Sequence, residues 1–134
     1  MTTDSLPPPR ASRVLVVDDT PHNVKLLADL LAVKGYATLE AVSAEDGLRL
    51  AAEHHPDLIL MDIQLPGMNG IEALKVLRAN PATAAIPAIA VTASVMQQDR
   101  NQITEAGFDG YLGKPLNLKE FLDAVKTVLE RGRP

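Results

Sequence analysis

The chain has 134 residues, a formal net charge of −4 and no cysteine. This length suits one domain with its own core, and the missing cysteines exclude disulfides, thiolate metal sites and cysteine nucleophiles. The acidic charge disfavours a nucleic acid partner, and no apolar stretch reaches the ~18 residues of a membrane span or forms a signal peptide after Met1. We therefore expect a small cytoplasmic domain that contacts neither nucleic acid nor membrane directly.

The first segment, residues 1–12, carries three consecutive prolines at Pro7–Pro9 and shows no hydrophobic periodicity. Such a segment buries too little apolar surface to order itself, so we predict a disordered tail over residues 1–12. Short apolar runs then alternate with helical patterns, which places the folded domain over residues 13–131.

Residues 13–17 (RVLVV) form a β-branched run that ends at two aspartates, as expected of a strand buried on both faces. Thr20 is then placed to cap a helix that has Pro21 as its first residue and ends before Gly35. The remaining strands are predicted at residues 36–41, 58–61, 86–91 and 110–112. The remaining helices are predicted at residues 44–54, 71–79, 97–106 and 118–131, with Ser43 and Asn117 as caps.

Five β-then-α units with short connections predict an α/β domain, a doubly wound parallel sheet with helices on both faces. In such folds, sites form at the carboxyl ends of the strands, near the point where the strand order reverses. Reactive side chains stand at four of the five predicted strand ends: Asp18 and Asp19, Asp62, Thr92 and Lys114. The topology therefore predicts that three carboxylates, a hydroxyl and an ammonium group meet at one rim of the sheet.

Like charges packed together at this rim cost free energy unless a cation neutralises them. Mg²⁺ is the natural answer, since it binds one or two carboxylates together with water and phosphate oxygens, and Mn²⁺ is the alternative ion. The remaining carboxylate can then act as a nucleophile toward phosphorus and form an acyl phosphate. Lys114 and Thr92 are placed to stabilise the charge of the transferring group.

Four motifs carry a family resemblance: VLVVDD at the first strand, LILMDIQLPGMNG at the third, AVTAS at the fourth and YLGKP at the fifth. In this order and spacing, over about nine-tenths of the chain, they resemble the receiver domains of two-component response regulators. The resemblance implies the CheY-like fold, a five-stranded sheet in the order 2-1-3-4-5. Within the family, the chain is similar to the small regulators of bacterial cell division (DivK-like) and to the receivers fused to hybrid kinases.

The resemblance assigns the metal and acceptor roles to particular residues. Asp62 is implied to be the phosphoacceptor and also a ligand of Mg²⁺. Asp19 is implied to bind the ion directly, Asp18 mainly through water, and Gln64 through its backbone carbonyl.

The resemblance also assigns the groups that hold and sense the phosphoryl group. Lys114 is implied to pair with the phosphoryl group and with Asp62, while the Thr92 hydroxyl and the Ala93 amide donate to phosphoryl oxygens. Tyr111 stands three residues before Lys114, where the family keeps its switch aromatic. The implied switch moves Thr92 and Tyr111 and so changes the surface made by the fourth helix, fifth strand and fifth helix.

The functional prediction is a single-domain response regulator, not an enzyme on other substrates, that catalyses only its own phosphorylation and dephosphorylation. A sensor histidine kinase or a histidine phosphotransfer protein is the expected donor, and the chain is expected to be a monomer or weak dimer. We expect no output domain after Arg131, and we therefore expect the signal to leave by protein contact through the surface of the fourth helix, fifth strand and fifth helix.

Two alternatives remain open on the sequence. A pseudo-receiver would bind partners without phosphorylation, although such a domain lacks the acceptor or the lysine, and this chain has both. A flavodoxin-like FMN module shares the sheet, but it needs a glycine- and hydroxyl-rich phosphate loop where this chain has Asp18–Pro21.

Overall fold

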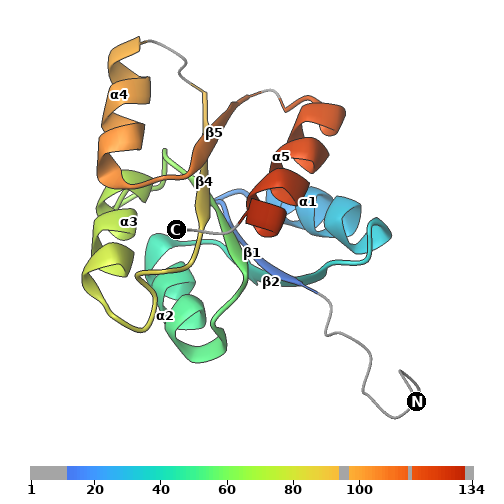
Figure 1. Ribbon diagram of the computed structural model, residues 1–134, viewed down its shortest axis with the longest axis horizontal. Coiled ribbons are helices and arrows are strands. Elements are labelled where there is room, and N and C mark those ends of the chain that lie inside the picture. Colours follow the sequence, from blue (N-terminus) through green and yellow to red (C-terminus); the bar gives the residue numbers. More distant parts are fainter. Residues whose placement is uncertain (1–11, 94–96, 115, 132–134) are drawn as a thin grey trace.

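The computed structural model describes residues 12–93, 97–114 and 116–131, and in these ranges strands alternate with helices (Figure 1). The strands are β1 (Arg13–Val17), β2 (Ala37–Ala41), β3 (Leu58–Asp62), β4 (Ala88–Thr92) and β5 (Gly110–Gly113). The helices are α1 (Pro21–Val33), α2 (Ala44–His54), α3 (Gly70–Ala79), α4 (Gln97–Ala106) and α5 (Leu118–Arg131). The predicted disordered tail lies outside the described residues, apart from Ser12.

The five strands form one parallel sheet in the order β2-β1-β3-β4-β5, which confirms the predicted doubly wound α/β fold. The chain moves outward from β1 to β2 and then returns to place β3 on the other side of β1. The strand order therefore reverses between β1 and β3, which is where such folds place their sites.

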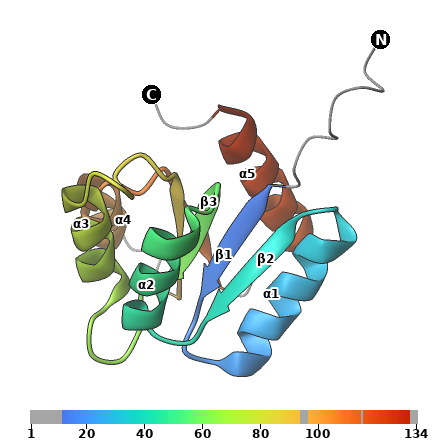
Figure 2. The same cartoon turned by 90° about the horizontal axis from the view of Figure 1, so that it is seen from below.

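Helices cover both faces of the sheet, with α1 and α5 on one face and α2, α3 and α4 on the other (Figures 1 and 2). Alternate residues of each strand feed the two cores, because side chains of a strand point to opposite faces in turn. Leu15 and Ile59 pack with α2, α3 and α4, whereas Val14 and Leu58 pack with α1 and α5. Strands buried on both faces thus explain the continuous apolar runs in the sequence.

The helix starts follow the predicted caps with two differences. Ser43 and Asn117 accept hydrogen bonds from backbone N–H groups three residues on, as predicted. Thr20 occupies the cap position of α1, but its side chain makes no cap hydrogen bond. Helix α3 begins at Gly70, one residue earlier than predicted, because Asn69 and Glu72 form a reciprocal capping box that the sequence analysis missed.

The strand limits differ from the predictions by one or two residues. Strand β4 begins at Ala88 rather than at residue 86, since Pro87 has no N–H to donate and contributes only its carbonyl, which accepts from the Ile59 N–H. Strand β3 extends to include Asp62 and β5 extends to Gly113, while β2 begins one residue later than predicted. Asp62 is thus anchored in the strand.

The amino end of the sheet holds a buried ion pair between α3 and the segment before β5. The Arg78 guanidinium contacts the Asp109 carboxylate at 3.4 Å, and both side chains are at least four-fifths buried. Asp109 also accepts from the N–H of Ala88, the first residue of β4. The guanidinium donates further hydrogen bonds to the backbone carbonyls of Ala84, Ile86 and Gly107. This cluster ties α3, α4, β4 and β5 together.

No helix within the described ranges is both long and apolar enough to cross a membrane.

Candidate functional site

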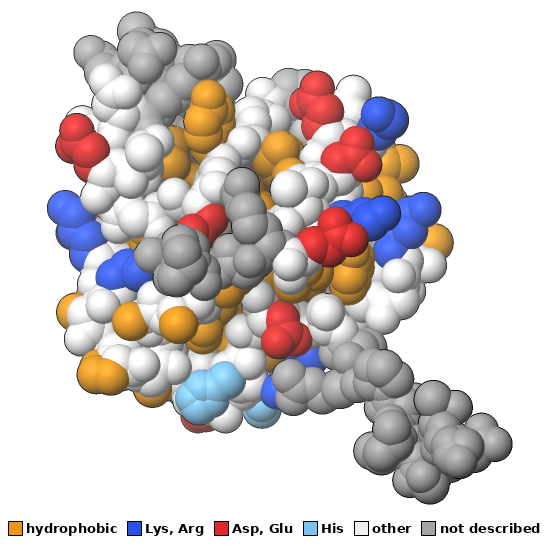
Figure 3. Space-filling view, viewed as in Figure 1, with side chains coloured by type: hydrophobic (Ala, Val, Ile, Leu, Met, Phe, Trp, Pro, Cys, Tyr) orange, Lys and Arg blue, Asp and Glu red, His pale blue; other side chains and the backbone are white. Residues whose placement is uncertain are grey.

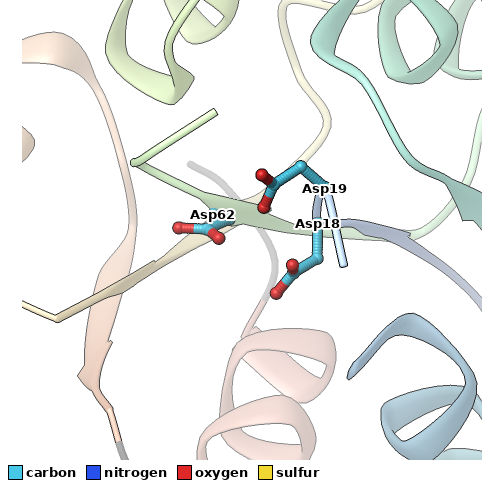
Figure 4. Close-up of side chains that lie close together, drawn as sticks. All are labelled: Asp18, Asp19 and Asp62. Carbon is cyan, nitrogen blue, oxygen red and sulfur yellow. The ribbon is translucent and has the colours of Figure 1, made fainter. Parts of the chain in front are cut away.

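The carboxyl ends of β1 and β3 bring three acidic side chains together (Figure 4). Asp18 and Asp19 follow β1 directly, and Asp62 is the last residue of the neighbouring strand β3. Each offers a carboxylate oxygen, and the three oxygens lie within 4.8 Å of one another. The structure therefore places the three predicted carboxylates in one cluster at the point where the strand order reverses.

Asp62 lies at the bottom of this cluster and is only 2% exposed. Its Oδ1 accepts a hydrogen bond of 2.9 Å from the backbone N–H of Gln64, and its Oδ2 accepts one of 2.9 Å from the Lys114 ammonium group. Both carboxylate oxygens are therefore held in position by donors from other parts of the site.

The two acidic residues after β1 differ in exposure. Asp18 is 3% exposed, and its Oδ1 accepts from the backbone N–H of Thr20, which fixes the first turn of the loop. The other oxygen of Asp18 lies 3.6 Å from the Lys114 Nζ. Asp19 is exposed, so it gives the cluster a carboxylate that solvent and small ions can reach.

The buried charges shift the acidity of two groups. Burial raises the pKa of Asp62 above its ordinary value, and hydrogen bonds from Lys114 and Gln64 offset this only in part. Burial alone would lower the pKa of Lys114, but the hydrogen bond to Asp62 and the negative charges of Asp62 and Asp18 outweigh it, so the pKa of Lys114 is raised. Lys114 therefore stays protonated, and the carboxylates outnumber it.

Three carboxylates facing one ammonium group leave an excess of negative charge, and the donor atoms are all oxygens. Hard divalent cations such as Mg²⁺ and Mn²⁺ prefer this donor set. The residues present therefore fit a divalent metal ion, with Asp18, Asp19 and Asp62 as the side chains able to hold it.

Thr92 and Lys114 reach the same rim from the neighbouring strands. Thr92 ends β4 and is buried, and its carbonyl accepts from the Lys114 N–H at 2.8 Å, which joins the two strand ends. Ala93 follows at the surface. Tyr111 lies on β5 opposite Ala90 and is 38% exposed. Its role as a switch stays a prediction.

The turn after Asp62 makes a close backbone contact that the sequence did not predict. The Ile63 carbonyl accepts hydrogen bonds from the N–H groups of both Leu65 and Gly70, which folds residues 63–70 back onto the end of β3. Gly70 then starts α3 directly against the main chain of Asp62. The only sequence signal for this contact is a glycine eight residues after a strand-end aspartate, at the first position of a helix.

A cavity of about 370 Å³ opens from the acidic cluster into the space between α1 and α5. Its polar end is formed by Asp18, Asn23 and Lys114. Leucines from both helices line the rest, including Leu26 and Leu118, which are each about half exposed. Over these two helices, the surface shows apolar side chains among acidic and basic ones (Figure 3).

Comparison with known proteins places this geometry in context. Residues 14–126 match the model of the response regulator receiver domain. The polar-differentiation response regulator DivK of Brucella ovis is 43% identical over 116 residues, which cover 87% of this chain and 94% of DivK.

Two solved structures are similar across most of both chains. The receiver domain of sensor histidine kinase PA1611 from Pseudomonas aeruginosa, which has a magnesium ion coordinated in its active site cleft, has a TM-score of 0.83 and 30% identity, over 90% of this chain and 99% of that one. A CheY-like receiver domain protein from Methanospirillum hungatei has a TM-score of 0.84 and 29% identity, over 91% and 96% of the two chains.

Proposed function

The chain belongs to the response regulator receiver domains, and on that premise we propose that Asp62 accepts a phosphoryl group from a phosphohistidine donor in a Mg²⁺-dependent reaction. One observation carries the proposal: a buried carboxylate lies 2.9 Å from the Lys114 ammonium group, and two further carboxylates lie within 4.8 Å of it. The match to receiver domains and the DivK relatives supports a role in two-component signalling. We place this reaction in the bacterial cytoplasm.

Asp19 and Asp62 would hold Mg²⁺ directly, Asp18 would hold it mainly through water, and the Gln64 carbonyl would complete the protein ligands, with Mn²⁺ as the alternative ion. When bound, the ion neutralises the carboxylates and the negative oxygens of the incoming phosphoryl group. The magnesium ion of the PA1611 receiver domain supports this choice.

In the proposed reaction, a carboxylate oxygen of Asp62 attacks phosphorus. An O–P bond forms as the P–N bond to the donor imidazole breaks, and the leaving nitrogen takes a proton from solvent. Lys114 pairs with the transferring group through its positive charge, while the Thr92 hydroxyl and the Ala93 amide donate to its oxygens. Attack of water on the acyl phosphate later returns free Asp62 and inorganic phosphate.

The proposed output is a change in protein contacts. Thr92 moves toward the phosphoryl group, Tyr111 turns inward, and the surface made by α4, β5 and α5 changes its affinity for a downstream target. The phosphodonor is a sensor histidine kinase or a histidine phosphotransfer protein. The DivK relatives support contact-based output, since the matched region covers 94% of their length.

Incubation with acetyl phosphate and Mg²⁺, followed by intact-mass measurement, tests this proposal. We expect one added phosphoryl group in the wild-type chain and none in Asp62→Asn or after removal of divalent metal. Gln64→Ala is the matched control, since it keeps the backbone carbonyl and should still be phosphorylated. A wild-type chain that stays unmodified with acetyl phosphate and with a panel of phosphorylated histidine donors would contradict the proposal and favour a pseudo-receiver.

A further inference from the structure

Gly70 lies closer to the phosphoacceptor main chain than any residue with a side chain could. A Cβ built on Gly70 would lie 2.5 Å from the Asp62 carbonyl oxygen and 2.9 Å from the Ile63 Cα. Both distances are far inside van der Waals contact, and both neighbours are backbone atoms. They cannot move away by changing a rotamer, so a side chain at position 70 must displace the main chain that carries Asp62.

Two other glycines show that this contact is specific. A Cβ on Gly47 would also meet an atom at 2.8 Å, but that atom is a methyl carbon of the Val17 side chain. A Cβ on Gly110 would meet nothing within 4 Å. None of the three is in the left-handed region, so the need for glycine at position 70 comes from the close approach and not from backbone strain.

The contact is part of a short closed loop. The Gly70 N–H donates to the Ile63 carbonyl at 3.0 Å, which holds the first turn of α3 against the end of β3. Within the loop, the Gln64 N–H donates to the Asp62 carboxylate. A displacement of the chain at Asp62 and Ile63 therefore moves the acceptor carboxylate together with the main chain of Gln64.

We propose that Gly70 is a positioning residue for phosphoryl transfer, whose missing side chain lets α3 seat against Asp62 and so sets the position of the acceptor carboxylate and of the Gln64 main chain. This inference rests on the proposed phosphorylation of Asp62. It adds a residue that touches neither the phosphoryl group nor the metal and acts only through the backbone of the acceptor.

The test compares four variants: Gly70→Ala, Gly47→Ala, Gly110→Ala and Asn69→Ala. The rate of phosphorylation by acetyl phosphate is measured at saturating Mg²⁺, well below the thermal midpoint of each variant. We expect Gly70→Ala to lose at least tenfold in rate, while Gly47→Ala and Gly110→Ala stay within twofold of wild type. Asn69→Ala removes the capping box of the same helix without adding a Cβ at position 70, so it should lose stability but keep its rate.

A second readout needs neither metal nor phosphodonor. In amide correlation spectra of the metal-free chains, the Gln64 amide should shift in Gly70→Ala and stay in place in Gly110→Ala, because it is hydrogen bonded to the Asp62 carboxylate. A merely structural role for Gly70 would lower the thermal midpoint and leave this resonance and the rate unchanged.

The outcomes separate the two proposals. An unphosphorylated wild-type chain would overturn the proposed function itself. A phosphorylated wild type with Gly70→Ala within twofold of it, or with Asn69→Ala equally slow, would overturn only the role of Gly70. A Gly70→Ala chain without a folded state would also overturn it, since the contact would then serve folding and not positioning.

Discussion

At the amino end of the sheet, the Arg78 guanidinium meets the Asp109 carboxylate and three backbone carbonyls, so that each buried charge has its counterpart. At the carboxyl end, Asp18 and Asp62 are at least as deeply buried but share the single ammonium group of Lys114, and Asp19 adds a third negative charge. Both clusters are buried and polar. They differ in whether the charges balance.

The difference indicates what each end is for. A buried charge whose hydrogen bonds are all made locks elements together, and its loss leaves an uncompensated partner. A buried cluster with excess negative charge instead lowers stability until a cation arrives. The amino end therefore stabilises the fold, whereas the carboxyl end favours the binding of a cation, which would neutralise its excess negative charge. Substitutions at the two ends should therefore change different measured quantities.

The largest expected effect is at the amino end. Arg78→Ala should lower the free energy of unfolding by about 3–5 kcal/mol, because Asp109 loses its ion pair with the guanidinium and the carbonyls lose their donor. Urea unfolding measures this change. At temperatures where the variant is folded, its phosphorylation rate should stay within twofold of wild type. If the free energy of unfolding fell by less than about 1 kcal/mol, or if the phosphorylation rate of the folded variant also fell, the proposed difference between the two ends would be wrong.

The next largest effect is expected at Lys114. Lys114→Met keeps the length of the side chain but removes the charge, so phosphorylation should slow by at least about tenfold, or ~1.4 kcal/mol of barrier. Mg²⁺ should bind more tightly to this variant than to wild type, because one repelling positive charge is gone. Phosphorylation kinetics and calorimetric titration with Mg²⁺ measure the two changes, and weaker Mg²⁺ binding would contradict the charge argument.

A smaller effect is expected at Asp62, where substitution should raise the free energy of unfolding, whereas substitution of Arg78 should lower it. Because its pKa in the folded chain is raised above the ordinary 3.8, its contribution to stability is present below that value and is lost as the pH rises through the folded-state pKa. At neutral pH without metal, Asp62→Asn should therefore be more stable than wild type, by on the order of 1 kcal/mol.

Thermal unfolding at several pH values tests this expectation, and the gap between Asp62→Asn and wild type should close in acid. Added Mg²⁺ should also narrow the gap at neutral pH, since it stabilises the wild-type site by binding only the folded chain. If Asp62→Asn were less stable than wild type at neutral pH in chelator, the idea of an unbalanced cluster would be wrong.

The smallest effect is expected at an exposed ion pair. Lys25 and Asp29 lie 3.5 Å apart on α1, with both side chains more than 60% exposed. Lys25→Ala should change the free energy of unfolding by less than about 0.5 kcal/mol, because solvent screens such pairs. This variant is the reference with which the unfolding free energies of the buried-site variants are compared. A larger change in the free energy of unfolding would mean that burial does not determine the effect of an ion pair in this protein.

The sequence was sufficient to predict the carboxyl-end cluster because the strand topology determines it. In a parallel sheet the carboxyl ends of all strands lie at the same rim. The strand limits alone therefore placed four side chains together: Asp18, Asp62, Thr92 and Lys114. Whether Gln64 and Tyr111 act as the family resemblance implies depends on backbone and rotamer changes that a strand pattern does not carry.

The amino-end cluster could not be predicted in the same way. Arg78 stands in the last turn of a helix, where a basic side chain ordinarily faces solvent, and its partners come from two separate segments of the chain, one before β4 and one before β5. Nor does a glycine at the start of a helix reveal how close the neighbouring backbone lies, so the contact between Gly70 and Asp62 became visible only in three dimensions. Contacts set by packing distance, unlike those set by strand register, leave little trace in sequence.

The most direct test is to locate the phosphoryl group on the chain. The acyl phosphate formed with acetyl phosphate is trapped by borohydride reduction, and the modified residue is identified by peptide mass spectrometry, with and without a chelator of divalent metal. We expect modification at Asp62 alone, and only when Mg²⁺ is present. Modification at another residue, or equal modification of Asp62 in chelator, would contradict the proposed Mg²⁺-dependent phosphorylation of Asp62.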